Sequence, residues 1–188
     1  ADKELIIVVD KESDLPDIKT PDNIRAFVLN PTYSLGNKRN YATYKAQGEL
    51  IVMLDDDDLY APDYLSKCVE TIGDNDITGT NQLYFYQQPD KAWLFTYPAG
   101  AQPYVCGSGM CFKKEFWQRN KFPDLVSGED TVFVSKTSRI KAHGYLNGIV
   151  AMIHGANTCS HISLRNKEFS VIDPAIVRNI LSKDLLLQ

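Results

Sequence analysis

Two continuous hydrophobic runs dominate the first half of the chain. Residues 5–9 (LIIVV) end at Asp10, and residues 50–54 (LIVML) lead into four consecutive aspartates. Runs without polar alternation are typical of strands buried on both faces. Residues 24–29 predict a shorter strand, and residues 36–47 and 63–72 predict helices that stop at Gly48 and Gly73. This alternation predicts an α/β fold with a mostly parallel sheet flanked by helices.

The second half of the chain has a less regular pattern. Strands are predicted at residues 77–86 and 92–97 as antiparallel additions, followed by a tight loop at 107–109 that precedes residues 110–112. A helix is predicted from 128 to 137, and after a last apolar run at 148–153 an amphipathic C-terminal helix is predicted at 174–187. The aromatic-rich segment 84–95 is interpreted as sheet core. We find no repeat or linker, so the sequence predicts one domain over residues 1–188.

Composition narrows the possible classes of function. Of 188 residues, 44% are hydrophobic and 23% charged, with a net charge of −4, as in ordinary globular proteins. The charge argues against an extended nucleic-acid surface, which needs clustered Lys and Arg. No apolar run approaches the roughly 20 residues of a membrane span, and the N-terminus shows no secretory pattern. The four cysteines form no CxxC pair, so we expect reduced thiols and a cytoplasmic location.

The acidic run Asp55–Asp56–Asp57–Asp58 carries the most chemical information. Ligands of open α/β sheets bind at the carboxyl ends of the strands, where this run falls. If the chain stays extended, Asp55 and Asp57 point to the same side. Such close carboxylates repel unless a cation neutralises them, and hard oxygen ligands suit Mg²⁺ or Mn²⁺. The alternative is a solvated acidic turn, with Asp58 capping the next helix.

Several segments in the same order resemble a known family. They are GNKRN at 36–40, AQGELI at 46–51 and LDDDD at 54–58, followed by Pro62. Together they resemble the inverting glycosyltransferases of family 2, which have a GT-A fold and an Asp-X-Asp motif. Residues 5–10, 107–112 and 128–130 are similar to further segments of that family. The resemblance implies transfer of a sugar from a nucleotide-sugar, most often a UDP-sugar, to an acceptor hydroxyl.

The resemblance also implies that residues 1–100 form the nucleotide-sugar-binding half of the domain and residues 101–188 the acceptor-side half. It implies the following roles for residues on the donor side. Asp10 would recognise the nucleobase, and Arg39 would lie near the base or the diphosphate. Asp55 would contact the ribose or the metal, next to Asp56 in the donor site. The implied metal ligands for Mn²⁺ or Mg²⁺ are Asp57, Asp55 and His154, with His161 as the rival histidine.

On the acceptor side, the resemblance implies that Asp130 is the general base and that Glu129 orients the acceptor or supports that base. Each position also has a structural interpretation. Asp10 would then simply end a strand in a turn, Glu129 and Asp130 suit the first turn of a helix because of its dipole, and a lone histidine such as His154 is often structural.

The sequence departs from the family at its start and leaves two rival functions open. Family members begin with an earlier strand and helix, whereas this chain starts at what corresponds to the second strand, as in a fragment or a minimal version. One rival is a metal-dependent phosphotransferase or nucleotidyltransferase, but Leu59-Tyr60 after the acids does not fit the aspartyl-phosphate pattern, and no P-loop is present. The other rival is a non-catalytic nucleotide-sugar-binding module.

Overall fold

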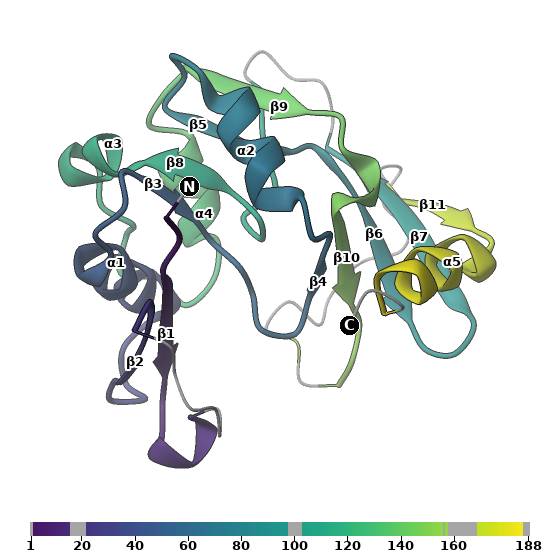
Figure 1. Ribbon diagram of the computed structural model, residues 1–188, viewed down its shortest axis with the longest axis horizontal. Helices are drawn as coiled ribbons and strands as arrows, with labels where there is room; N and C mark the ends of the chain where they lie inside the picture. The colour runs from purple at the N-terminus through teal and green to yellow at the C-terminus, as the bar shows by residue number, and fades with distance from the viewer. Residues whose placement is uncertain (1, 16–21, 98–102, 156, 158–168, 186–188) are drawn as a thin grey trace. The chain divides into compact units, whose positions relative to one another are not determined.

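The computed structural model describes residues 2–15, 22–97, 103–155, 157 and 169–185 (Figure 1). The chain divides into two compact units that alternate along the sequence. The first unit comprises residues 1–51 and 112–136, and the second comprises residues 52–111 and 137–188. Parallel and antiparallel strand pairs both occur, as the sequence predicts. The organisation of the whole chain as one domain stays a prediction.

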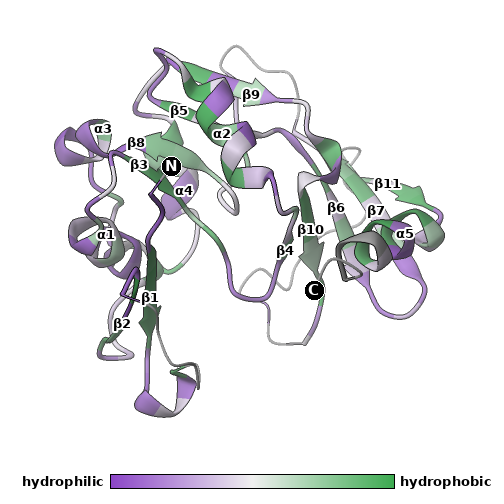
Figure 2. Ribbon diagram, viewed as in Figure 1, coloured by the Kyte–Doolittle hydropathy of each residue, from purple (hydrophilic) through white to green (hydrophobic). Residues whose placement is uncertain are grey.

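The first unit is built around a parallel strand pair and one long helix. Strand β1 pairs in parallel with β2, and Leu5 lies opposite Ile24. Figure 2 shows β1 as a run of hydrophobic residues, in keeping with its all-aliphatic sequence. The elements of this unit are β1 (Leu5–Val9), a short 3-10 turn η1 (Glu12–Asp14), β2 (Ile24–Val28), α1 (Leu35–Lys45), β3 (Leu50–Val52), β8 (Cys111–Lys113), α3 (Lys114–Arg119) and α4 (Glu129–Val134).

Helix α1 has a defined beginning. The Ser34 hydroxyl accepts a hydrogen bond from the Asn37 amide at 3.2 Å, which satisfies one of the free N–H groups of the first turn. Gly36 is required by close packing, because a Cβ there would lie 1.9 Å from the carbonyl oxygen of Pro123. The helix therefore starts one residue earlier than predicted and is held against the 123–125 segment, where Gly36 N also donates to Leu125 O at 3.0 Å.

Aromatic side chains form the core beneath α4. Phe122 and Phe133 stack with ring centroids 4.0 Å apart, and Phe112 meets Phe133 edge-on at 5.0 Å. All three rings are buried. Aromatic pairs of this kind stabilise a fold beyond their buried area by about 0.5–1.5 kcal/mol each. The packing fixes the short helix that carries Glu129 and Asp130.

The second unit contains a five-stranded mixed sheet in the order β11-β7-β6-β10-β4. Strand β6 pairs antiparallel with β7 and parallel with β10. A separate parallel pair joins β5 to β9, with Ile77 opposite Ile140. The elements are β4 (Leu59–Tyr60), α2 (Tyr64–Ile72), β5 (Ile77–Thr80), β6 (Gln82–Gln87), β7 (Lys91–Thr96), β9 (Ile140–His143), a 3-10 turn η2 (Leu146–Gly148), β10 (Ile149–Met152), β11 (Phe169–Ile172) and α5 (Pro174–Leu185).

Helix α5 covers part of this sheet. Val177 is fully buried and packs with Tyr84, Tyr86 and Val150 in one hydrophobic cluster. Trp93 is buried as well, so the predicted core role of the aromatic segment is confirmed. Among the described residues, no helix is long and apolar enough to span a membrane. Cys68, Cys106 and Cys111 are free thiols, as expected, and Cys159 lies outside the described residues.

Some predicted boundaries differ from the structure. The predicted strand 77–86 is two strands, because the Thr80 hydroxyl accepts a hydrogen bond from the Gln82 amide at 3.1 Å and interrupts the ladder. The short elements β4, β8, β9, β11 and α3 were not predicted from the sequence. Strands β9 (IKAH) and β11 (FSVI) are only four residues long and have too little hydrophobic pattern to stand out.

Candidate active site

The acidic run follows β3 but is not extended. Met53 N donates to Met110 O at 2.9 Å, and Gly109 N donates to Met53 O at 2.8 Å, so the chain is still paired just after the strand. It then turns, with Asp58 N directed at Asp55 O at 3.4 Å. The expectation that Asp55 and Asp57 share one side of an extended strand is therefore wrong. A turn places these carboxylates instead.

Asp57 meets a histidine from the other end of the sequence. Its Oδ2 lies 2.9 Å from His154 Nε2. Asn157 supports both groups, since its Nδ2 lies 3.1 Å from Asp57 Oδ2 and its Oδ1 accepts from His154 N at 2.6 Å. Asp57 and His154 are both about one third exposed, with side-chain exposures of 36% and 41%. The pair is thus positioned by hydrogen bonds yet reachable by a ligand.

Asp58 has a different, structural environment. Its Oδ2 accepts from the Ser108 hydroxyl at 2.7 Å, and its Oδ1 accepts from Met152 N at 3.1 Å. Burial, and then the nearby carboxylates Asp55 and Asp57, raise the pKa of Asp58 to about 6, although the two hydrogen bonds oppose this. Asp58 does not cap the next helix, which begins at Tyr64 after Asp63.

A tyrosine fixes the start of the turn. The Tyr60 hydroxyl accepts from Asp55 N at 2.8 Å and lies 2.6 Å from the Ser108 hydroxyl. Burial raises the pKa of Tyr60 well above its usual value, so it stays protonated. Asp56 is exposed on the turn. The sequence analysis missed Tyr60, Ser108 and Asn157. The only sequence signals for them were the Gly107-Ser108-Gly109 loop and the His-x-x-Asn spacing from 154 to 157.

The remaining predicted site residues lie in the first unit, where α1 and α4 bring two of them together. Arg39 Nη1 lies 3.1 Å from Glu129 Oε1, and the two side chains are only 9% and 3% exposed. Asp10 Oδ1 lies 2.5 Å from Lys38 Nζ. Arg39 and Glu129 thus form a buried ion pair, in which each charge compensates the other.

Asp130 is half-buried in the first turn of α4. Its Oδ1 accepts a hydrogen bond from the Thr131 amide at 2.7 Å. Gly128, with a φ of +76°, supplies the left-handed turn that leads into this helix. The turn orients Glu129 toward Arg39 and leaves Asp130 accessible.

A divalent cation fits the chemistry of the second-unit residues. Asp57 supplies a carboxylate oxygen and His154 an imidazole nitrogen, and both side chains are accessible to a ligand. Among the described residues, no group of three His, Cys, Asp or Glu side chains is arranged to hold a metal. Two protein ligands are nevertheless typical where diphosphate oxygens and water complete the shell. His161, the rival ligand, lies outside the described residues.

An α/β fold with a carboxylate-rich turn directly after a strand is the arrangement of GT-A glycosyltransferases. A sequence model of glycosyl transferase family 2 matches residues 2–131. The chain therefore belongs to glycosyl transferase family 2, and the predicted family and fold class are confirmed. A comparison with curated protein sequences found no significant match.

Solved structures of TarS from S. aureus share this fold. A structure of TarS residues 1–349 has 17% sequence identity to this chain and a TM-score of 0.54. The match covers 80% of this chain and 60% of the TarS chain. The same fragment in complex with UDP-GlcNAc has 15% identity and a TM-score of 0.56, with coverages of 97% and 71%. A third TarS structure has 16% identity and a TM-score of 0.53, with coverages of 97% and 43%. The chain thus spans 60% of the first of these structures.

Proposed function

We propose that the chain is a metal-dependent, inverting glycosyltransferase that moves a sugar from a nucleotide-sugar, a UDP-sugar in the first instance, to an acceptor hydroxyl. The observation that carries this proposal is the contact between Asp57 and His154 at the turn that follows β3. Family membership supports the reaction class. The TarS complex with UDP-GlcNAc supports the choice of UDP as the first nucleotide to test.

Asp57, His154 and Asp55 would hold a Mn²⁺ or Mg²⁺ ion together with the diphosphate. When bound, such a cation neutralises the charge that develops on the departing diphosphate. The protein positions the ligands in advance, because Asn157 hydrogen-bonds to both Asp57 and His154, and Tyr60 holds the backbone of Asp55. Asp56 is exposed on the same turn and would contact the donor.

Asp130 would accept the proton of the acceptor hydroxyl as that hydroxyl attacks the anomeric carbon. A carboxylate within hydrogen-bond reach of a nucleophile is suited to this role, and a single displacement inverts the configuration at that carbon. Glu129 is buried against Arg39, which favours a supporting role over contact with the acceptor. Asp10 and Arg39 remain our candidates for the donor nucleotide. The buried free thiols fit the cytoplasmic location that we propose.

UDP binding and turnover test the proposal separately. Release of UDP from UDP-GlcNAc or UDP-glucose, with Mn²⁺ and with a chelator, is measured alongside the melting temperature. We expect metal-dependent stabilisation and metal-dependent UDP release. Metal-dependent binding without turnover, over a panel of acceptors, indicates the non-catalytic binding module. If no nucleotide-sugar binds and none releases its nucleotide, the glycosyltransferase and the binding module are both contradicted.

A further inference from the structure

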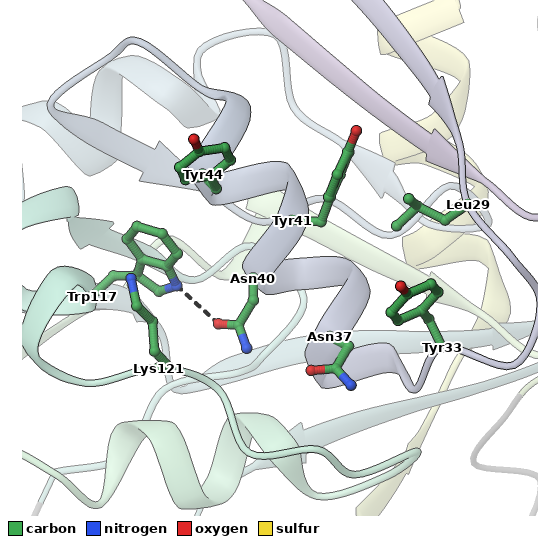
Figure 3. Close-up of a pocket in the computed structure, with 8 residues that line it drawn as sticks. All are labelled: Leu29, Tyr33, Asn37, Asn40, Tyr41, Tyr44, Trp117 and Lys121. Carbon is green, nitrogen blue, oxygen red and sulfur yellow. Dashed lines mark hydrogen bonds between the residues drawn. The ribbon is translucent and has the colours of Figure 1, made fainter.

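A groove in the first unit lies beside α1, with Trp117 and Lys121 among its lining residues (Figure 3). Its volume is about 450 Å³, which falls within the range of small-molecule sites. Asn37, Asn40, Tyr41 and Tyr44 line it from α1. These positions have the spacing i, i+3, i+4, i+7 and so form one stripe of the helix.

This stripe is separate from the residues proposed to act on the donor. The buried positions of α1 are Gly36, Arg39 and Thr43. At 3.6 residues per turn they point well away from the stripe formed by residues 37, 40, 41 and 44. Arg39 therefore faces Glu129, and the groove needs an explanation of its own.

The floor of the groove is held in place by hydrogen bonds. Asn40 Oδ1 accepts from Trp117 Nε1 at 2.9 Å and from Phe122 N at 3.0 Å, while Asn40 Nδ2 donates to Phe122 O at 2.9 Å. The Trp117 ring is buried. A preformed floor lowers the ordering cost of binding. The hydrogen bond to Asn40 also occupies the Trp117 N–H. That N–H is therefore not available to bind the carbonyl group of a peptide, which argues against a peptide as the ligand of the groove.

The walls of the groove expose aromatic rings. Tyr44 is 69% exposed and Tyr33 is 50% exposed. Large rings gathered around a cavity are characteristic of binding surfaces. A ring face packs well on the C–H face of a sugar, and the tyrosine hydroxyls and the Asn37 amide both donate and accept, as sugar hydroxyls require.

The charge of the groove is positive. Lys121 is the one charged side chain among its lining residues, and its ammonium lies over the Trp117 ring. The Lys45 ammonium lies 5.3 Å from the ring centroid of Tyr41 and 5.8 Å from that of Tyr44. Partial burial, and then the nearby Lys114, lower the pKa of Lys121, so an anionic group on a ligand would stabilise its ammonium.

We propose that the groove binds a saccharide that carries an anionic group, with a sugar ring against Tyr44 and the anion at Lys121. Carboxylates and phosphates are both suitable anions, because an ammonium pairs with either. This site does not depend on the transfer reaction, since none of its lining residues belongs to the proposed donor or catalytic set.

Methyl β-glucuronide and glucose 6-phosphate are suitable probes, with methyl β-glucoside as the neutral counterpart. Binding to the whole chain is followed by ligand-observed NMR titration. We expect Tyr44→Ala to weaken binding of the anionic probes about five- to tenfold through loss of stacking. Lys121→Gln should weaken it about tenfold or more through loss of a charge-assisted hydrogen bond. Tyr44→Phe keeps the ring and removes only its hydroxyl, so it should weaken binding less than Tyr44→Ala. Lys11→Gln, which removes an exposed lysine that does not line the groove, should leave binding unchanged.

The two anionic probes distinguish a carboxylate preference from a phosphate preference, and binding of either supports the proposal. Four results would overturn it: neither anionic probe binds the unaltered chain, both substitutions leave affinity intact, the neutral glucoside binds as tightly, or a proline-rich peptide occupies the groove instead. Metal-dependent stabilisation by UDP, recorded on the same samples, reports on the acidic turn and should not respond to Tyr44→Ala. Failure of the groove and failure of the proposed function are therefore distinguishable.

Discussion

Asp57 and His154 are 97 positions apart in the sequence, yet Asp57 Oδ2 lies 2.9 Å from His154 Nε2. The contact exists because β10 ends at Met152, where Met152 N donates to Asp58 and Met152 O accepts from Asn157. The carboxylate turn and the segment after β10 are thereby held together in the second unit. The histidine assignment for the metal site rests on this arrangement.

Removal of either partner should weaken metal-dependent nucleotide binding. With Mn²⁺ present, UDP should raise the melting temperature of the chain, by mass action on the folded state. His154→Ala and Asp57→Asn should each reduce the apparent UDP affinity about tenfold or more, in line with the effects of losing groups around a metal. The measurement is a thermal-shift titration with Mn²⁺ and with a chelator.

Asp74→Asn, which changes an exposed carboxylate far from the turn in sequence, serves as the matched control and should behave as the unaltered chain. His161→Ala should have a smaller effect than His154→Ala. Equal UDP stabilisation with Mn²⁺ and with chelator would remove the metal role, and a reversed order of the two histidine variants would move the ligand to His161.

Asp58 should make the metal-free protein less stable as pH rises. Its pKa is about 6 in the folded protein, against an ordinary value of 3.8. Because the folded-state pKa is raised, the stability linked to protonation is present in full below about pH 4 and is lost as pH rises through 6. Asp58→Asn removes the ionisation and can keep both hydrogen bonds, accepting from Met152 N and donating to the Ser108 hydroxyl.

In a chelating buffer at pH 7.5 we therefore expect Asp58→Asn to have a higher melting temperature than the unaltered chain. The corresponding gain in the free energy of unfolding is on the order of 1 kcal/mol. At pH 4 the two should converge. The measurement is the difference in melting temperature between the two proteins across this pH range. A difference that does not vary with pH would contradict the assignment of a raised pKa to Asp58.

The fold was largely predictable where the hydrophobic pattern was strong. The run at residues 5–9 forms β1, the run at 50–54 forms β3 over residues 50–52, and the helix predicted before Gly48 is present as α1. The expectation that β1 is buried on both faces is wrong, because its residues are exposed or half-buried in a two-stranded pair. The roles within the acidic run were not predictable, because they depend on partners far away in sequence. Asp58 has a structural environment, unlike Asp57, because it accepts hydrogen bonds from the Ser108 hydroxyl and from Met152 N.

The groove shows the same limit. Its α1 residues have a readable helical spacing, but only the packing of Trp117 and Phe122 against Asn40 turns that stripe into a cavity. The pairing of Arg39 with Glu129 was also not predicted from the sequence, because the family resemblance implied a separate role for each residue. Contacts between distant segments decide these features, and a single sequence carries little information about them.

The Arg39–Glu129 pair should be important for stability through charge compensation. Glu129→Gln leaves the Arg39 guanidinium buried without its carboxylate, and we expect a cost of about 3–5 kcal/mol. The double variant Arg39→Met, Glu129→Leu removes both charges and should recover much of that loss. Chemical denaturation of the double variant and of its two component singles, Arg39→Met and Glu129→Leu, measures the coupling free energy between the two side chains. If the double variant loses as much stability as the two singles together, the two charges do not compensate each other.

Asp130→Asn should separate chemistry from folding. The amide oxygen of Asn can still accept the hydrogen bond from Thr131 N, so the first turn of α4 should persist. What is lost is the group that accepts the proton of the acceptor hydroxyl during attack. Loss of a general base typically lowers the rate by about 10²–10⁴.

With a confirmed acceptor, we therefore expect sugar transfer by Asp130→Asn to fall by that order while UDP affinity stays within a few-fold. Asp124→Asn, which changes an exposed carboxylate in the segment that precedes α4, is the matched control and should transfer normally. Asp57→Asn supplies the contrast, because it should impair nucleotide binding as well as transfer. If Asp130→Asn transfers at a near-normal rate, Asp130 is not the base. Glu129 could act as the base in place of Asp130 only by leaving Arg39, because Glu129 is only 2% exposed and paired with that residue. A reaction without a protein base would then be the simpler explanation.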